Sequence, residues 1–434
     1  MTVTEWPKPS LGPAEVKSAR PSEAGAGTLR NRRVVWKFGG TSVGDADRLR
    51  AVARRLVSAR RQGMQVVAVL SAMGGTTDEL VRQAYGLSAE PQPRELDALL
   101  CVGEITSCAL AAIAVHELGE RAVSLTGSQA GILTDESHGN ARLRQISPER
   151  IIEALDEGAI VLVAGFQGVS GTGDVTTLGR GGSDATAIAL ASVLGARECD
   201  IFTDVPGVFT ADPRVVSNAR KLTVVSHEEM LQLADAGARV MQTRAVELAA
   251  AHDIDIHVRS SFSSDPGTWI RRQPSSLEGE RVSGIAHIGH DPLYSVSCRS
   301  PAMVSAAMAE RGLAIGLIVY SEGKVGFTAP GVGSAQVMAA MAAMDLEVSA
   351  REDLGSVSVV SAMVVNRSDV AATVLSALET SGIHPQLIGC MPNRVSCHVP
   401  AGDVGRAAQV LHDAFQLDAD EESSSREAHL ECAA

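Results

Sequence analysis

Two glycine-rich segments of the 434-residue sequence combine the residue types that phosphate chemistry needs. The first is KFGGTS at 37–42, which follows the apolar run VVWK and precedes a helical pattern near Asp45. Two glycines at a strand-to-helix turn let backbone N–H groups approach a phosphate, and the helix N-terminus adds its positive end. Lys37 supplies a charge for the β- and γ-phosphates. Because the lysine precedes the glycines, this is not a Walker A sequence, and a glycine turn with a surface lysine stays open as an alternative.

The second glycine-rich segment, TTLGRGGSD at 176–184, directly precedes the apolar helical run ATAIALAS. Its Arg180 is suited to a bidentate contact with a substrate carboxylate. Asp184 would repel a phosphate, so it is better suited to orient a lysine such as Lys37 or to meet a substrate ammonium. Two glycine-rich helix starts in one sheet indicate two anions held face to face, which is the arrangement that phosphoryl transfer requires.

A third segment, TDVPGVFTADPR at 203–214, follows a predicted strand and is rich in turn residues. This pattern is typical of a long functional loop rather than an edge strand. Phe209 is suited to cover an adenine ring, and Arg214 is suited to reach a phosphate. Taken alone, the segment also fits a plain surface loop.

The elements that must position these segments alternate between strand and helix from Arg33 to about Arg272. Apolar residues recur at helical spacing over 49–56, which places them on one helix face. The predicted buried strands lie at 34–37, 66–71, 160–166 and 199–203. Strands that alternate with helices imply an α/β domain, in which helices cover both faces of a mostly parallel sheet. Ligands of such sheets bind at the carboxyl ends of the strands.

The second half, from 281 to 417, contains an internal repeat. Gly312, Leu317, Ile318, Val325 and Pro330 recur 70 residues later as Gly382, Leu387, Ile388, Val395 and Pro400. Each copy reads strand, helix, strand, strand, helix, which predicts two tandem ferredoxin-like α+β modules. Such modules fit ligand sensing or dimerisation, and a structural appendage stays open as an alternative.

The composition indicates a soluble, acidic protein. The 38 basic and 51 acidic residues leave a formal charge of −13, which argues against binding to nucleic acid or an anionic membrane. No apolar run approaches the ~18 residues that cross a bilayer, and the first thirty residues contain no signal-peptide core. Seven cysteines without a CxxC pair fit a cytoplasmic location. Residues 1–32 are expected to form a disordered extension, and 418–434 an acidic tail.

Taken together, these segments resemble the aspartokinase family of the amino-acid-kinase fold, nearly continuously from 33 to 272. The matching strings are KFGGTSV at 37–43, SAMGGTTDEL at 71–80, GEITS at 103–107, TGSQAGILTD at 126–135, VAGFQGV at 163–169, TTLGRGGSDATA at 176–187, TDVPGVFTADPR at 203–214 and VRSSFS at 258–263. The repeat over 281–417 is similar to the paired ACT domains that follow the catalytic domain in that family.

The resemblance implies transfer of the ATP γ-phosphate to the side-chain carboxylate of L-aspartate, with ATP and Mg²⁺ as cofactors. It implies Lys37 and Asp184 as catalytic residues and a homo-oligomer formed through the ACT-like domains. The nucleotide-binding residues implied are Lys37, Phe38, Gly39, Gly40, Ser71, Thr203, Asp204, Phe209, Arg214 and Arg239. The substrate-binding residues implied are Thr77, Glu104, Arg180, Ser183 and Asp184. Mg²⁺ is expected on the phosphates. No protein metal site is expected, because His287, His290 and Asp291, which have the spacing of metal ligands, fall in a linker.

Two departures from the family pattern bear on activity and regulation. Arg239 stands where the resemblance implies a lysine that contacts nucleotide phosphates, so the KM for ATP is expected to differ. The first ACT-like copy has Cys298-Arg299-Ser300-Pro301-Ala302 where the family carries a D-x-P-G-like turn for an effector carboxylate, and the second copy, with Asn366-Arg367-Ser368-Asp369, matches only in part. We therefore expect weakened or altered feedback inhibition by lysine and threonine.

Two other hypotheses stay open. In the first, the chain is another kinase of the same fold and acts on glutamate, acetylglutamate, carbamate or UMP. In the second, it is a non-catalytic amino-acid-sensing subunit. The GRGGSD string and Glu104 argue against the first, and the intact Lys37 and Asp184 argue against the second.

Overall fold

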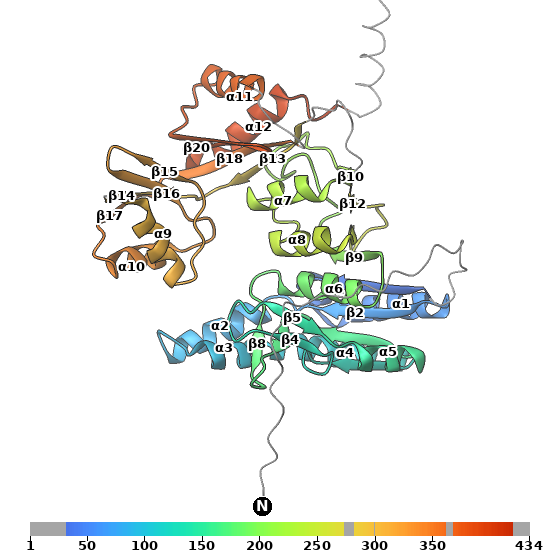
Figure 1. Cartoon of the computed structure of the whole chain (residues 1–434). Coiled ribbons are helices and arrows are strands. Elements are labelled where there is room, and N and C mark those ends of the chain that lie inside the picture. The colour runs from blue at the N-terminus through green and yellow to red at the C-terminus, as the bar shows by residue number, and fades with distance from the viewer. Residues whose placement is uncertain (1–31, 273–281, 299, 362–367, 420–434) are drawn as a thin grey trace, which may run out of the picture.

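The computed structural model describes residues 32–272, 282–298, 300–361 and 368–419. Most of the expected extension and tail, together with Arg299, Asn366 and Arg367, therefore lies outside the described residues. The described chain forms a large α/β domain followed by two small α+β modules (Figure 1).

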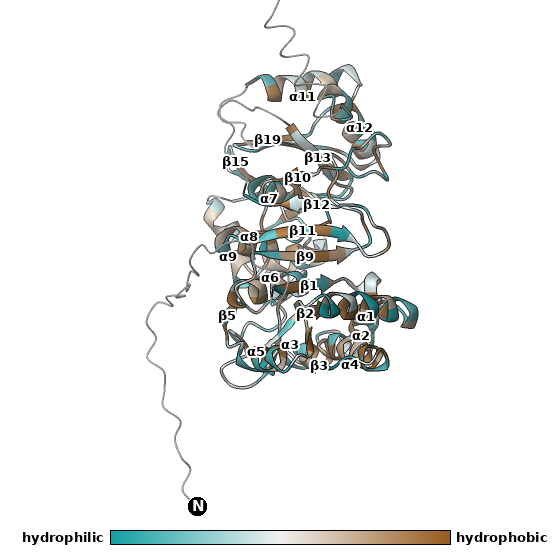
Figure 2. Ribbon diagram, turned by 90° about the vertical axis from the view of Figure 1, so that its right-hand side faces the viewer, coloured by the Kyte–Doolittle hydropathy of each residue, from teal (hydrophilic) through white to brown (hydrophobic). Residues whose placement is uncertain are grey.

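The α/β domain is built on an eight-stranded sheet in the order β10-β12-β11-β9-β1-β2-β6-β3. All of its pairs are parallel except β11 with β12. Figure 2 shows β12, β11, β9, β1 and β2 following one another down the molecule. The strands are β1 (Arg33–Phe38), β2 (Gln65–Leu70), β3 (Ala122–Leu125), β6 (Ile160–Ala164), β9 (Glu198–Thr203), β10 (Val224–Val225), β11 (Asp255–Ser260) and β12 (Thr268–Ile270). The predicted mostly parallel sheet is confirmed.

Helices cover both faces of this sheet. On one face α1 and α4 enclose a core that includes Leu56 and Leu162, and on the other face α5, α6, α7 and α8 enclose a larger core. Helix α6 is buried on all sides, because it contacts the sheet on one side and α8 on the other. The helices are α1 (Ala46–Arg61), α2 (Thr76–Leu87), α3 (Pro93–Leu100), α4 (Val102–Glu117), α5 (Glu149–Asp156), α6 (Gly182–Val193), α7 (His227–Asp235) and α8 (Thr243–His252).

A second, smaller sheet lies beside the first in the order β5-β4-β7-β8. Its strands are β4 (Ile132–Thr134), β5 (Leu143–Ile146), β7 (Gln167–Val169) and β8 (Val175–Thr177). Strand β8 ends immediately before the LGRGGSD segment, so this sheet sets the start of the second glycine-rich turn.

One expectation about apolar runs is wrong. The stretch Pro93–Glu117, which comprises α3 and α4, is long enough to cross a membrane, and an 18-residue window within it has a mean hydropathy of 2.1. Half of that window is buried inside the protein, where α4 packs on α1 and on the sheet. Its apolar character therefore reflects a core helix, because contact with the sheet and with α1 requires apolar residues on more than one face.

The two α+β modules are nested. The first follows the continuous order β14-α9-β15-β16-α10-β17, and its sheet order is β15-β16-β14-β17. The second consists of β18-α11-β19-β20-α12, and its sheet is completed by β13 from before the first module, in the order β13-β18-β20-β19. The predicted tandem arrangement therefore describes only the order of the two modules along the chain. It misses the pairing of β13 with β18, which the repeat pattern does not reveal because the first module is inserted between these strands.

The strands and helices of the modules are β13 (Val282–Ile288), β14 (Leu293–Ser297), β15 (Ile318–Ser321), β16 (Lys324–Thr328), β17 (Val348–Arg351), β18 (Leu354–Ser361), β19 (Leu387–Met391), β20 (Arg394–Pro400), α9 (Pro301–Glu310), α10 (Ser334–Ala342), α11 (Ser368–Thr380) and α12 (Val404–Ala414). The repeat itself is visible at matched turns, because Gly312 and Gly382 both follow a helix with positive φ, at 62° and 68°. The modules dock on the α/β domain through contacts of α7 with β13 and β18.

Candidate active site

The candidate site lies at the carboxyl ends of β1, β2 and β9. The chain leaves β1 at Phe38 and turns at once into the 3₁₀ helix Gly40–Val43. The N–H of Gly39 donates to the carbonyl of Phe202 at 3.0 Å, which ties this turn to the end of β9. A Cβ at Gly40 would lie 2.8 Å from the carbonyl oxygen of Ala72, so only glycine lets the turns after β1 and β2 approach this closely.

Lys37 and Asp184 meet inside this site. The Nζ of Lys37 lies 2.5 Å from Oδ1 of Asp184, and the two side chains are only 12% and 10% exposed. Asp184 sits in the first turn of α6, where the helix N-terminus favours a negative charge. The two residues come from the two glycine-rich segments, so tertiary packing brings those segments together as their chemistry suggested.

The turn into α6 depends on glycine. Gly181 is the N-cap of α6 and has a left-handed backbone with φ of 73°. A Cβ there would lie 2.0 Å from Cγ of Gln242, so a side chain is excluded by space as well as by conformation. Ser183 follows in the first turn, is 8% exposed, and packs against Gly165 at the end of β6. The hydroxyl of Ser183 therefore lies on the same rim as Lys37.

Glu104 lies in the first turn of α4 and is 3% exposed. Its Oε1 accepts a hydrogen bond from the N–H of Ala72 at 3.2 Å, whereas Oε2 has no hydrogen-bond partner among the described residues. Burial raises the pKa of this carboxyl to about 7. A buried carboxyl with one free oxygen can receive a cationic group and become fully ionised when it does so.

The remaining substrate-side candidates lie at the edges of the same region. Thr77 is in the first turn of α2 and half-buried, directly after the turn that contacts Glu104. Arg180 is exposed in the turn before α6, and within the described part of the chain its side chain makes no hydrogen bond or ion pair. Its guanidinium is therefore free to bind an anion from outside.

The nucleotide-side candidates lie on the loop after β9. The hydroxyl of Thr203 donates to Asp204 at 3.2 Å, and Phe209 is half-buried and forms a β-bridge with Lys221. The guanidinium of Arg214 binds Asp212 through two nitrogens, at 2.7 Å and 2.9 Å, and lowers the pKa of that carboxyl. This pairing holds Arg214 in one orientation on the surface.

Arg239 is exposed in the turn between α7 and α8. Burial lowers the pKa of His287 on β13; Asp212 opposes this effect, whereas the positive charges of Arg214 and Arg239 add to it. Arg214 and Arg239 therefore both act on the charge of one histidine, although 25 residues separate them in the sequence. Ser71 directly follows β2 and is half-buried, and its N–H donates to the carbonyl of Phe38 at 3.1 Å.

Sequence reasoning missed Asp97, a buried carboxylate whose hydrogen bonds hold the end of β8, directly before the second glycine-rich turn. Asp97 is 1% exposed on α3 and accepts hydrogen bonds from His138 Nδ1 at 2.9 Å, Gly139 N at 3.0 Å, Thr177 N at 3.0 Å and Thr177 Oγ1 at 2.5 Å. The only sequence signal was a lone aspartate within the apolar run LDALL, and nothing there indicates its partners.

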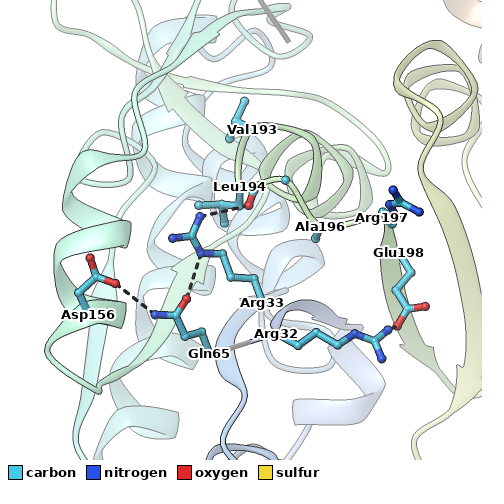
Figure 3. Close-up of a pocket in the computed structure, with 10 residues that line it drawn as sticks. Arg32, Arg33, Gln65, Asp156, Val193, Leu194, Ala196, Arg197 and Glu198 are labelled. Carbon is cyan, nitrogen blue, oxygen red and sulfur yellow. Dashed lines mark hydrogen bonds and ion pairs between the residues drawn. The ribbon is translucent and has the colours of Figure 1, made fainter. Parts of the chain in front are cut away.

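A separate cavity lies away from this site. It has a volume of about 830 Å³ and opens at the amino ends of β1, β2 and β9. Figure 3 shows its polar groups facing one another: Arg33 donates to Gln65 and to the carbonyl of Leu194, and Arg32 pairs with Glu198. These groups largely satisfy each other, so the cavity's size does not by itself indicate chemistry.

The described residues contain no cluster of three or more His, Cys, Asp or Glu side chains that could hold a metal ion. His287 and His290 are separated by the end of β13, and Asp291 turns inward to accept a hydrogen bond from His398 at 2.9 Å.

Comparison with known proteins gives consistent results over nearly the whole chain. The sequence model of the amino acid kinase family matches residues 32–260, and the model of an ACT domain matches residues 357–415. The aspartokinase of Geobacillus stearothermophilus is 43% identical over 397 residues, covering 88% of this chain and 97% of that protein. The aspartokinase of Mycolicibacterium smegmatis is 42% identical over 410 residues, covering 90% and 97%.

Solved structures agree with the sequence comparisons. The crystal structure of Escherichia coli aspartokinase III in complex with aspartate and ADP, in the R-state, superposes with a TM-score of 0.76 at 25% identity, covering 88% of this chain and 99% of that one. The T-state of the same enzyme with lysine and aspartate gives a TM-score of 0.70 over the same shares.

Proposed function

Because the chain belongs to the aspartokinase family, we propose that it transfers the γ-phosphate of ATP to the side-chain carboxylate of L-aspartate and forms 4-phospho-L-aspartate. One observation carries this proposal. Lys37 and Asp184 form a nearly buried ion pair where two glycine-rich helix starts meet, and this is the arrangement that brings two anions together.

Lys37 stabilises the charge on the transferred phosphoryl group, and Asp184 holds its ammonium in place. The nearly buried position strengthens the effect of that charge, because water screens it less than at the surface. Gly39 and Gly40 let the backbone close over the phosphates. Mg²⁺, brought in with ATP, neutralises part of the phosphate charge.

The substrate side recognises both ends of an amino acid. The free Oε2 of Glu104 receives the α-ammonium, and its ionisation is favoured once that cation is bound. Arg180 binds a substrate carboxylate, and the hydroxyls of Thr77 and Ser183 add hydrogen bonds. The attacking carboxylate is already ionised at neutral pH, so no general base is required.

The nucleotide side is formed by the loop after β9 together with the turn before α8. Phe209 covers the adenine, Thr203 and Asp204 bind next to it with Ser71 and Phe38, and Arg214 and Arg239 reach the phosphates. Two arginines on one side suit a polyphosphate, because guanidinium groups bind phosphate oxygens in pairs.

We further propose that the protein forms homo-oligomers through its regulatory modules. The edge strand β15 is exposed along its whole length and carries Ile318, Val319 and Tyr320, which are 39%, 40% and 49% exposed. An apolar edge strand invites pairing with another strand. Val319→Lys is expected to lower the mass found by light scattering after gel filtration, and an unchanged mass would place the interface elsewhere.

The six described cysteines are all free thiols. Free thiols fit a reducing compartment, so we place the reaction in the cytoplasm.

The decisive experiment measures acyl-phosphate formation by the purified protein with ATP, Mg²⁺ and L-aspartate, trapped as the hydroxamate. Aspartate-dependent hydroxamate that is lost in Lys37→Ala and retained in Lys324→Ala, a lysine on an exposed position of β16, is the expected result. Turnover with glutamate, acetylglutamate, carbamate or UMP instead would establish another kinase of this fold. Binding of ATP without any turnover would favour an amino-acid-sensing subunit.

A further inference from the structure

The loop proposed to bind the nucleotide is partly built into the second regulatory module. Ala211 and Val216 are 5% and 0% exposed, and both belong to the hydrophobic core of that module rather than to a core of the α/β domain. In that core they join residues of β13, β18, β20 and α12. The chain therefore crosses from one unit to the other within the 203–214 loop.

Thr210 marks the crossing point and is held by four hydrogen bonds. Its N–H donates to the carbonyl of Arg220 at 2.7 Å, and its own carbonyl accepts from Ile285 N on β13 at 2.7 Å. Its hydroxyl accepts from Arg220 N at 2.9 Å and lies 2.9 Å from Nε2 of His412 on α12. Thr210 is 1% exposed, so water does not replace any of these partners.

His412 depends on the same contact. It is 0% exposed, and its Nδ1 has no hydrogen-bond partner among the described residues, the nearest carboxylate being Asp413 at 4.0 Å. Burial lowers the pKa of His412, with Arg220 adding to this effect and Asp413 and Asp418 opposing it. The neutral ring can therefore accept the proton of the Thr210 hydroxyl through Nε2.

The anchor lies next to the groups that would contact ATP. Phe209 precedes Thr210 directly, and Arg214 follows four residues later. The intervening turn is short and internally bonded, since Asp212 accepts from both the N–H and the guanidinium of Arg214. A displacement of Thr210 is therefore passed on to both residues instead of being absorbed by the loop.

We propose that His412 is a positioning residue of the nucleotide site, acting through Thr210 to hold Phe209 and Arg214 in place. The inference rests on the proposed function in assigning the nucleotide to this loop. It makes the last helix of the regulatory module a support of ATP binding, so a change in the packing of that module changes the affinity for nucleotide.

The test measures the Kd of MgADP by calorimetry and the KM values for ATP and aspartate in the full-length protein. His412→Leu removes the hydrogen bond and is expected to weaken MgADP binding and raise the KM for ATP by about three- to tenfold, the loss of one buried hydrogen bond. The KM for aspartate is expected to stay within about twofold, because Glu104 and Arg180 do not touch this loop. His412→Gln and Thr210→Ser each keep a hydrogen-bonding group at this contact. Both variants are therefore expected to keep the wild-type Kd for MgADP and the wild-type KM for ATP.

A matched control separates positioning from general loss of stability. His398→Leu removes another buried histidine of the same module, one that bonds to Asp291 and not to the loop. It is expected to lower the melting temperature while leaving MgADP binding unchanged. Thr210→Val combined with His412→Leu is expected to be no worse than Thr210→Val alone, since both act through one contact.

Two results would overturn the inference. One is a His412→Leu protein that melts earlier but binds MgADP as the wild type does, which would make the contact purely structural. The other is a His398→Leu protein that loses MgADP affinity equally. Because MgADP binding is measured without turnover, both results can be read even if aspartate is not the substrate. If the wild type binds no MgADP at all, the inference falls together with the proposed nucleotide site.

Discussion

Glu104 accepts a hydrogen bond from the N–H of Ala72 at 3.2 Å through one carboxylate oxygen, while its other oxygen has no partner among the described residues. Ala72 belongs to the turn after β2, which also touches Gly40. Glu104, the ammonium-binding candidate, and Gly40 of the phosphate-binding turn therefore both contact the backbone turn after β2. This arrangement places both ends of the proposed reaction on one rigid support.

Removal of the Glu104 charge is expected to weaken aspartate binding. Glu104→Gln should raise the KM for aspartate by about 10- to 100-fold, the loss of one hydrogen bond to a charged group. The KM for ATP should change little. Asp78→Asn, on an exposed position of α2, is the control and should leave both values unchanged. An unaltered KM for aspartate in Glu104→Gln would remove Glu104 from the site.

The raised pKa of Glu104 predicts a pH dependence of aspartate use. Burial raises the pKa to about 7, so below that pH the free enzyme holds a proton that must leave before an ammonium binds. The kcat/KM for aspartate should therefore fall about tenfold between pH 8 and pH 6, while aspartate itself stays ionised. In Glu104→Gln this decline should disappear. A wild-type profile flat across this range would contradict the assignment.

The same carboxyl is expected to cost stability at alkaline pH. Its folded pKa, about 7, lies above the ordinary value of 4.5, so the folded state retains a proton that the unfolded state loses. The free energy of unfolding should fall as the pH rises from 4.5 to 7 and stay low above that. Glu104→Gln should stabilise the protein at pH 8 by about 3 kcal/mol, since each unit of the raised pKa corresponds to about 1.4 kcal/mol. Urea denaturation at pH 5 and pH 8 measures the difference, and an equal effect at both would exclude this cause.

Asp97 is expected to matter for both stability and catalysis. Asp97→Asn replaces an acceptor of several hydrogen bonds by an amide with two donors, which should cost about 2–4 kcal/mol in the free energy of unfolding. The kcat/KM should also fall, because Thr177 directly precedes the turn that carries Arg180. Asp78→Asn again serves as the exposed control. A fully stable Asp97→Asn protein would show that the network around His138 and Thr177 is dispensable.

Arg239 is expected to contribute to nucleotide affinity. Arg239→Gln should raise the KM for ATP by about tenfold through loss of a phosphate contact, with kcat largely retained. Arg239→Lys keeps the charge but changes the geometry of the phosphate contact. Its KM for ATP should therefore lie between that of the wild type and that of Arg239→Gln. Arg50→Gln, an exposed arginine on α1, is the control. Equal KM values in wild type and Arg239→Gln would place Arg239 outside the site.

Feedback inhibition is expected to be weak. Ala302, at the start of α9, stands where an effector-binding turn would carry glycine, and its Cβ hinders close approach of a carboxylate to the backbone. Steady-state rates should stay within about twofold of the uninhibited value when lysine and threonine are added together at low millimolar concentration. A sharp concerted drop in rate would contradict this prediction and indicate that the modules still bind effectors.

Much of the architecture follows from local pattern. The runs at 34–37 and 66–71 are apolar up to their last residues, Lys37 and Ser71, and this pattern is typical of strands buried between helices. The glycines at 39–40 and 181–182 follow strands and precede helices, so their turns were also predictable. Lys37 and Asp184 could be singled out in this way, because helix starts attract anions whatever their surroundings.

The tertiary structure decided which of these groups meet and how each behaves. The 2.5 Å contact between Lys37 and Asp184 joins residues 147 positions apart, and the pairing of β13 with β18 crosses an entire inserted module. Neither is written in local periodicity. The raised pKa of Glu104, the hidden anchor at Asp97 and the link from Thr210 to His412 arise from burial. Burial depends on packing between segments that are distant in the sequence. The sequence by itself therefore predicted which residue types could do the chemistry, whereas the tertiary structure determined their distances and pKa values.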